Sequence, residues 1–142
     1  GLRAHNCNTG HLLRATVEGA TFGMRFGLDE LQRLGLEASE IILTGGGSNS
    51  AAWCQIVADV CRLPVTLLEQ DEGASFGAAL QALWVHERTG GADVTLAEVA
   101  DQHLSPRTPA CRTPDPAAAD RYTDVYADYR RAVDDAASRF QQ

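Results

Sequence analysis

The stretch IILTGGGSNSAAW, residues 41–53, constrains the fold more strongly than any other part of the chain. Residues 41–43 form an apolar run rich in β-branched side chains, which is typical of a short buried strand. Three glycines follow, and residues 50–62 then carry apolar side chains at helical spacing until Pro64 ends the helix. Residues 65–68 form a second apolar run. Two strands joined through a helix predict a right-handed parallel unit, with the glycines at the carboxyl end of its first strand.

A long helix is predicted before this unit. Either Asn8 or Thr9 can cap its start, and it ends near Gly35. Its apolar side chains recur every three or four residues, which predicts one buried stripe. The stripe consists of Leu13, Val17, Ala20, Met24, Leu28 and Leu31. Glycines recur four residues apart along the same helix, and they predict a neighbouring element packed close against it. They are Gly19, Gly23 and Gly27.

Three further helices are predicted after the second strand. The first begins near Gly73, and its small residues predict tight packing on the sheet. They are Ala74, Gly77, Ala78 and Ala82. Thr95 and Glu98 have the spacing of a capping box, which predicts a short helix. Four prolines in residues 105–116 predict an extended crossing segment. Residues 117–140 then return to a helical pattern, with one apolar side formed by Tyr122, Val125, Tyr126, Tyr129 and Val133.

This order of elements predicts an α/β fold with parallel strands and packed helices. Two strands alone make a poor sheet, so we expect further strands from another part of the polypeptide or from another chain. The length of 142 residues suits one ordinary domain. We expect residues 1–104 to form its core. We expect residues 105–142 to be a crossing segment and a terminal helix of the same domain.

Composition excludes several classes of function. The net charge of −7 argues against a nucleic acid or an anionic membrane as a partner. All twelve basic residues are arginine, and the absence of lysine excludes Schiff-base chemistry and a P-loop. The histidines and cysteines lack the spacing of metal ligands, so we expect no metal site made by them. No apolar run is long enough to span a bilayer and no signal peptide is visible, so we expect a cytoplasmic location.

The glycine turn is a candidate binding site. Backbone N–H groups at the start of a helix favour an anion such as a phosphate, and glycine lets a ligand approach the backbone closely. A tight bend with no ligand is one alternative. A dinucleotide-binding turn of an NAD-dependent oxidoreductase is another. Gly45, Gly47 and Ser50 give the pattern G-x-G-x-x-S, and Glu69 lies where a ribose-binding acid belongs.

Several segments together resemble the carboxyl-terminal lobe of the FGGY carbohydrate kinases, and the xylulokinases most of all. They are GL at 1–2, LLRATVEGATFGMR at 12–25, ILTGGGSNSAAWCQIVADV at 42–60, LPV at 63–65 and EGASFGAALQA at 72–82. They occur in the family's order and at its spacing, and the terminal helix sequence YTDVYADYRRA is also similar to the family's. The resemblance implies an actin-like, ribonuclease-H-like ATPase fold of two lobes. It implies that ATP, with Mg²⁺, binds in the cleft between them.

The resemblance also implies roles for the turn. Gly46 would approach the nucleotide and Ser50 would be placed to contact the adenine, while the glycines on either side would shape the turn. The full set of nucleotide-binding candidates is Gly45, Gly46, Gly47, Ser48, Asn49 and Ser50. The catalytic aspartate and most sugar contacts would lie in an amino-terminal lobe before Gly1. Neither Asp59 nor Asp71 matches that aspartate.

The expected function is phosphate transfer from ATP to a pentulose, from D-xylulose to D-xylulose 5-phosphate, by an enzyme that also has the amino-terminal lobe. The fragment alone is expected to be inactive. The expected partners are ATP, the sugar and that lobe, and a second copy of the chain is a further candidate. A non-catalytic interaction domain on an actin-like scaffold is the third alternative, and it predicts no nucleotide binding.

Overall fold

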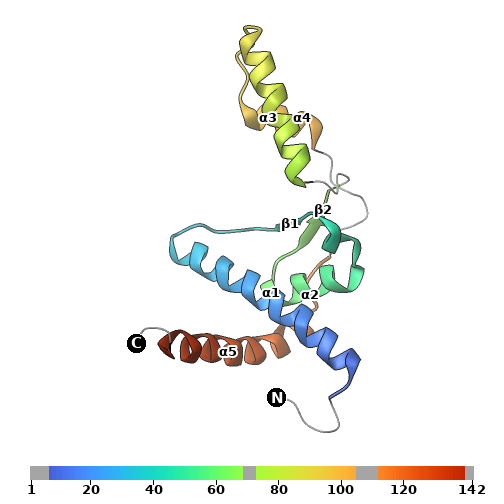
Figure 1. Ribbon diagram of the computed structural model, residues 1–142, viewed down its shortest axis with the longest axis vertical. Helices are drawn as coiled ribbons and strands as arrows, with labels where there is room; N and C mark the ends of the chain where they lie inside the picture. Colours follow the sequence, from blue (N-terminus) through green and yellow to red (C-terminus); the bar gives the residue numbers. More distant parts are fainter. Residues whose placement is uncertain (1–6, 69–72, 105–111, 140–142) are drawn as a thin grey trace.

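The structure is a computed structural model that describes residues 7–68, 73–104 and 112–139. The elements in chain order are α1 (Thr9–Arg33), β1 (Ile41–Leu43), the 3-10 turn η1 (Gly46–Asn49), α2 (Ala51–Cys61), β2 (Val65–Leu67), α3 (Gly73–Thr89), α4 (Leu96–His103) and α5 (Pro116–Arg139). In Figure 1, α1, α2 and α5 form one body with the two strands, and the hairpin of α3 and α4 projects from it.

The two strands pair in parallel, as the sequence predicts. Ile41 lies opposite Val65 and Leu43 lies opposite Leu67. On the other edge of β2, Arg112 forms an antiparallel bridge with Val65, with both backbone hydrogen bonds made at 2.8 and 2.9 Å. The described part of the proline-rich segment is therefore extended, and residues 105–111 lie outside the described residues. Pro116 is the first residue of α5, where the missing N–H costs nothing because no intrahelical acceptor exists there.

Helix α2 lies at the centre of the body. Val57, Ala58 and Val60 are fully buried, because α1, α5 and β2 all pack around this helix. The contact between α1 and α5 is aromatic. The ring of Phe22 lies among three tyrosine rings of α5, with ring centroids 5.5 to 6.0 Å apart, and these are Tyr122, Tyr126 and Tyr129. The predicted apolar side of α5 is confirmed at these tyrosines but is wrong at Val125, which is 46% exposed.

The predicted stripe on α1 is partly wrong. Val17 and Leu28 pack against the core, but Leu13 is 64% exposed and Leu31 is 48% exposed. The buried centre of the helix is instead Thr21 and Phe22. The reason is that α1 contacts α2 and α5 at once, so its buried face lies between the directions that apolar spacing alone suggests.

The predicted glycine seam on α1 is also mostly wrong. A Cβ added at Gly23 would lie 3.8 Å from the hydroxyl oxygen of Tyr129, which is ordinary contact. At Gly19 and Gly27 a Cβ would have no described atom within 4 Å. Among the described residues, a neighbour therefore comes close to this line of the helix only at Gly23.

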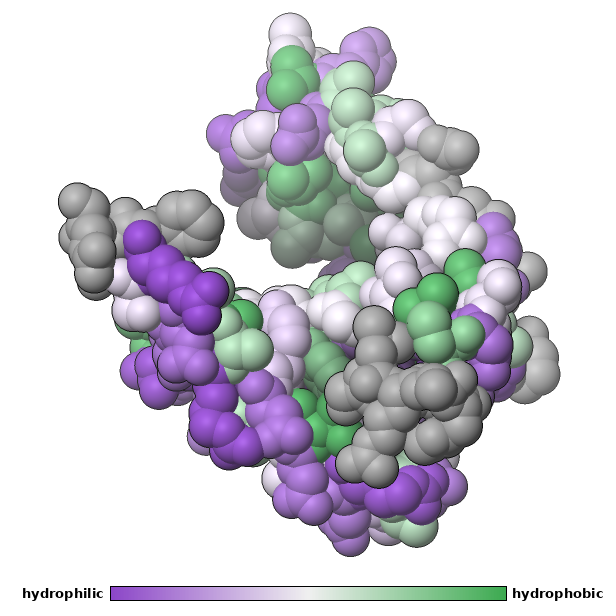
Figure 2. All heavy atoms as spheres, turned by 60° about the horizontal axis from the view of Figure 1, so that its bottom comes forward, coloured by the Kyte–Doolittle hydropathy of each residue, from purple (hydrophilic) through white to green (hydrophobic). Residues whose placement is uncertain are grey.

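Helix α3 comes close to the strands only at its first residue within the described range, where a Cβ added at Gly73 would lie 2.8 Å from the Thr44 hydroxyl oxygen. The rest of the helix does not pack tightly on the sheet, contrary to the sequence prediction. Leu80 is its one buried residue within the described range, and a Cβ at Gly77 would meet no described atom within 4 Å. Two strands offer little surface, and α3 packs on α4 instead. The indole Nε1 of Trp84 donates to the carbonyl of Val94 at 2.9 Å, which holds the connection between the two helices. Figure 2 shows apolar patches on either side of the open space beside this hairpin.

The capping box of α4 is confirmed. The hydroxyl oxygen of Thr95 accepts from the backbone N–H of Glu98, and the Glu98 carboxylate accepts from the backbone N–H of Thr95 at 2.7 Å. The Thr95 backbone N–H and the Thr95 hydroxyl both donate to the Glu98 carboxylate, and these two bonds hold the pKa of Glu98 below its ordinary value.

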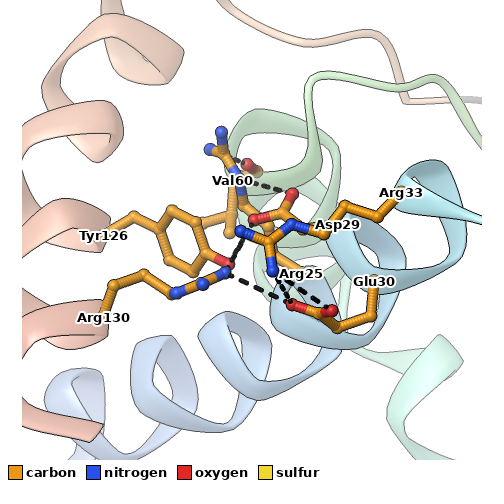
Figure 3. A network of polar contacts seen from close by, with 7 residues as sticks. All are labelled: Arg25, Asp29, Glu30, Arg33, Val60, Tyr126 and Arg130. Atoms are coloured by element: carbon orange, nitrogen blue, oxygen red, sulfur yellow. Dashed lines mark hydrogen bonds and ion pairs between the residues drawn. The ribbon is translucent and has the colours of Figure 1, made fainter. Parts of the chain in front are cut away.

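A polar network joins α1, α2 and α5 (Figure 3). Arg25 of α1 donates to the carbonyl of Val60 near the end of α2 at 2.6 Å and lies over the ring of Tyr126, 4.4 Å from its centroid. The Tyr126 hydroxyl donates to the Asp29 carboxylate at 2.5 Å, and Arg130 lies 3.5 Å from the same carboxylate. Burial raises the pKa of Tyr126, and its hydrogen bond to Asp29 raises it further. The network satisfies an end carbonyl of α2 and sets the position of α5 on α1.

We expect Tyr126→Phe to lower the free energy of unfolding by about 1–2 kcal/mol, because the ring stays but its hydrogen bond to a charged acceptor is lost. Urea unfolding measures this change. Tyr129→Phe is the matched control, because the hydroxyl of Tyr129 donates no hydrogen bond within the part of the chain that the structure describes. Equal losses in the two variants would show that the Tyr126–Asp29 bond contributes nothing of its own.

Candidate nucleotide-binding turn

The glycine turn has a defined backbone geometry at the carboxyl end of β1. Gly45 has φ +85°, which is unfavourable for residues with a side chain. Its carbonyl accepts from both the backbone N–H of Ser48 at 2.9 Å and the Ser48 hydroxyl at 2.7 Å. Ser50 N–H then donates to the carbonyl of Gly47 at 3.0 Å. Ser48 is buried and accepts from the Cys54 thiol, so this serine holds the turn from inside.

At Gly47, the space that a side chain would need is filled by a neighbouring ring. A Cβ added at this position would lie 1.4 Å from Cζ3 of Trp53, so only glycine fits under the indole. On its other side, the indole Nε1 donates to the Thr21 hydroxyl at 3.0 Å. Trp53 is therefore a packing residue that joins α1 to the turn, and Gly47 is required by that packing.

Gly46 differs from its neighbour. It is exposed, and a Cβ added there would meet no described atom within 4 Å. The N–H groups of Gly46 and Gly47 come before the first hydrogen bond of the turn, and within the described ranges they donate to no acceptor. An open backbone position with two available donors at the start of a helical segment is suited to an anionic or flat ligand.

The Ser50 hydroxyl already has a structural role. It is the N-cap of α2, and its hydroxyl oxygen accepts from the backbone N–H of Trp53 at 3.3 Å. Asn49 lies next to it at the exposed end of η1. Adenine contact by Ser50 stays a prediction, and any ligand would share this hydroxyl with the cap.

A second polar arrangement near the turn is not predicted by the sequence. Arg14 Nε donates to Glu18 at 2.6 Å and Arg14 Nη2 donates to the Tyr122 hydroxyl at 2.6 Å. The same hydroxyl donates to Glu18 at 2.7 Å. Burial raises the pKa of Tyr122, and the bond to Glu18 adds to that shift. The spacing of Arg14 and Glu18 is visible in the sequence, but Tyr122 is too distant along the chain to be linked to them.

Arg14 lies between two hollows of the surface. An apolar one of about 240 Å³ lies beside Ser50 and Trp53 and is completed by Leu13, Arg14, Val17, Ala52 and Ile56. A polar one of about 230 Å³ is lined by Arg14, Glu18, Asp59, Ala118, Arg121, Tyr122 and Val125. The apolar hollow therefore adjoins the turn, and the polar one lies between α1, α2 and α5.

The other candidate acids have structural or undescribed positions. Asp59 is buried, and its carboxylate accepts from the Gln55 amide at 2.9 Å and from the backbone N–H of Asp115 at 2.8 Å. It thus holds the start of α5. Glu69 and Asp71 lie outside the described residues. Among the described residues no group of three histidine, cysteine or acidic side chains could hold a metal ion.

Comparison with known proteins supplies the family. The model of the FGGY family of carbohydrate kinases, C-terminal domain, matches residues 1–86. The chain belongs to the FGGY family of carbohydrate kinases. Among curated FGGY relatives, the xylulose kinase of Haemophilus influenzae is 43% identical over 86 residues, covering 61% of this chain and 17% of that protein. The L-fuculokinase of Escherichia coli is 41% identical over 76 residues, covering 53% of this chain and 16% of that protein.

Solved structures of FGGY kinases match the whole fold. The xylulose kinase from Rhodospirillum rubrum matches with a TM-score of 0.78 and 31% identity, covering 100% of this chain and 28% of that one. The structure of a xylulose kinase from Brucella ovis matches with a TM-score of 0.79 and 30% identity, covering 97% of this chain and 27% of that one. The actin-like, ribonuclease-H-like fold class is thereby confirmed. The chain spans under a third of the length of these relatives. Within the described ranges, none of the helices is both long and apolar enough to cross a membrane.

The contrast between Gly46 and Gly47 makes a direct stability prediction. Gly47→Ala should lower the free energy of unfolding by about 2 kcal/mol, because the new methyl overlaps the Trp53 ring and forces it to move. Gly46→Ala should change it by less than about 0.5 kcal/mol, since its methyl enters open space. Urea unfolding of the two single variants measures both values. A similar loss at both positions would contradict the geometry of the turn described above.

Proposed function

We propose that this chain supplies the nucleotide-binding part of a cytoplasmic sugar kinase, with ATP approaching the turn at Gly46. The observation that carries the proposal is the open backbone at Gly46, between β1 and α2. Residues Gly45 and Gly47 shape the turn around that point, and Ser48 supports it from the core. On this proposal residues 1–104 are the nucleotide-binding core, and residues 105–142 complete the same domain.

The residues of the turn fit an adenine nucleotide in their chemistry. Gly46 presents a backbone donor, and the absence of a side chain at Gly46 leaves room for a flat group. When bound with Mg²⁺, ATP would supply the phosphoryl group that passes to the sugar hydroxyl. This chain's share is to bind and orient the nucleotide. Asp59 is occupied by Gln55 and Asp115, so the proton-accepting acid is proposed to lie in an amino-terminal lobe, together with most sugar contacts.

The proposed substrate is a pentulose, with D-xylulose converted to D-xylulose 5-phosphate. It is supported by relatives named as xylulose kinases in both comparisons. Relatives named L-fuculokinase and ribulokinase make other sugars the natural comparison in any assay. A second copy of this chain is proposed as a further partner.

A dinucleotide-binding turn is disfavoured by one observation. In the pattern G-x-G-x-x-S the second glycine is Gly47, whose backbone would have to approach the pyrophosphate. The indole of Trp53 already occupies the space over that residue. A non-catalytic interaction domain is distinguished by experiment, because it predicts no nucleotide binding.

We expect the chain to bind Mg·ATP, and Gly46→Ala to weaken that binding by about tenfold, since a methyl group would stand where the nucleotide approaches. Isothermal titration with ATP, ADP and NAD measures the affinities. Gly19→Ala is the matched control, because it also adds a methyl in open space but lies on α1 away from the turn. A chain that binds NAD but not ATP would favour the hypothesis of an NAD-dependent oxidoreductase. A chain that binds neither nucleotide would favour the hypothesis of an interaction domain.

We also expect residues 1–142 alone to release no ADP from ATP and Mg²⁺ in the presence of D-xylulose. A polypeptide that contains both this chain and the proposed amino-terminal lobe should release ADP. It should prefer D-xylulose to D-ribulose, L-fuculose and gluconate. A coupled assay of ADP release measures both. Phosphorylation by residues 1–142 alone would place the catalytic base within this chain and not in an amino-terminal lobe, which would overturn the proposal.

A further inference from the structure

Thr21 is a fully buried polar residue in the middle of α1. Its hydroxyl accepts from the indole Nε1 of Trp53 at 3.0 Å and donates to the carbonyl of Val17 at 2.8 Å. The hydroxyl is therefore oriented by its own helix, with its lone pair directed at the indole. A continuous chain of hydrogen bonds leads from the backbone of α1 to the ring of Trp53.

The other side of Trp53 contacts the glycine turn. Its ring covers Gly47 so closely that a Cβ there would overlap Cζ3 at 1.4 Å. Its backbone N–H donates to the Ser50 hydroxyl, at the end of the same turn. One residue thus touches both the middle and the end of the turn, while its ring nitrogen is held by α1.

The apolar hollow of about 240 Å³ lies directly beside Trp53, between Leu13 and Val17 of α1 and Ala52 of α2. Among the described residues, the hydrogen bond to Thr21 is the only directional interaction of the indole ring, since its other contacts are apolar. The ring position, and with it the path of the turn, is therefore sensitive to one hydroxyl.

We propose that Thr21 is a positioning residue for the nucleotide-binding turn, acting through Trp53 to hold the turn in the conformation that leaves the backbone of Gly46 open. The proposal rests on the proposed function for its consequence, nucleotide affinity, but not for its structural step. Thr21 is fully buried, so its effect on a ligand at the turn is indirect. Its hydroxyl holds the indole of Trp53, and the indole packs against the turn at Gly47.

The test uses three single variants of the chain. Thr21→Val keeps the shape and removes the hydrogen bond, and Thr21→Ser restores the hydroxyl. Thr16→Val is the matched control, because Thr16 makes the same bond to its own helix, to the carbonyl of Leu12 at 2.9 Å, but is exposed and does not contact Trp53. Fluorine NMR of protein labelled with fluorotryptophan reports on Trp53, and Trp84 in α3 is an internal reference.

We expect Thr21→Val to shift the Trp53 resonance and leave that of Trp84 unchanged. Amide hydrogen exchange at Ser48 and Ser50 should accelerate, because both N–H groups donate within the turn. Affinity for Mg·ATP should fall by up to about tenfold, because loss of one hydrogen bond at a desolvated group lowers the population of the turn conformation that binds. Thr21→Ser should restore all three measurements, and Thr16→Val should change none of them.

The outcomes separate this inference from the proposed function. Exchange at Ser48 and Ser50 that is the same in Thr21→Val and Thr16→Val overturns the positioning role, whatever happens to ATP. Faster exchange with unchanged ATP affinity also overturns it, because the turn would then not depend on Thr21 for binding. If the unmodified chain binds no ATP but exchange accelerates in Thr21→Val, the nucleotide function fails and the structural step stands.

Discussion

Burial of α2 is the constraint on which the rest of the described body depends. This helix follows the glycine turn and is enclosed by α1, α5 and β2, so Val57, Ala58 and Val60 lose all contact with solvent. Apolar burial of this kind contributes about 25 cal/mol per Å² and is the main favourable term for a small body. Enclosing a helix also requires that its ends and polar groups find partners. Arg25 meets that need at the carbonyl of Val60, and Asp59 is matched by Gln55 and Asp115.

Because of the same enclosure, one side of the turn is hydrogen-bonded to the core and the other side is open. Ser48 and Cys54 face inward and bond to the backbone of the turn, while Gly46 faces outward with open space above it. A ligand site built this way has its shape determined by the core beneath it. The proposed nucleotide function and the packing of α2 are therefore aspects of one structure. A change in how α2 sits against α1 is transmitted to the turn through Trp53.

Local features of the chain could be predicted from sequence because they depend on neighbours a few residues away. The strand before the glycines, the cap at Asn8 and the capping box at Thr95 are of this kind. The position of α3 could not be predicted in the same way. A face of small residues is found where a neighbouring element packs closely, but it is also found on a surface that no element covers. Gly77 is in the second situation, because a Cβ added there would meet no described atom within 4 Å. The stripe on α1 failed for a related reason, since a helix with two neighbours buries the positions between them.

In the candidate site too, local features could be predicted from the sequence and features that depend on tertiary packing could not. The six residues of the turn stand together in the sequence, but their roles do not follow from the letters. Gly46 and Gly47 are adjacent and identical, yet one is open and the other is filled by a ring. That ring is held by Thr21, which lies on another helix, and Arg14 is joined to Tyr122 across most of the chain. Such pairs are set by tertiary packing. A glycine run in a strand–turn–helix segment therefore indicates where to look for a ligand, and only the packing shows which glycine faces it.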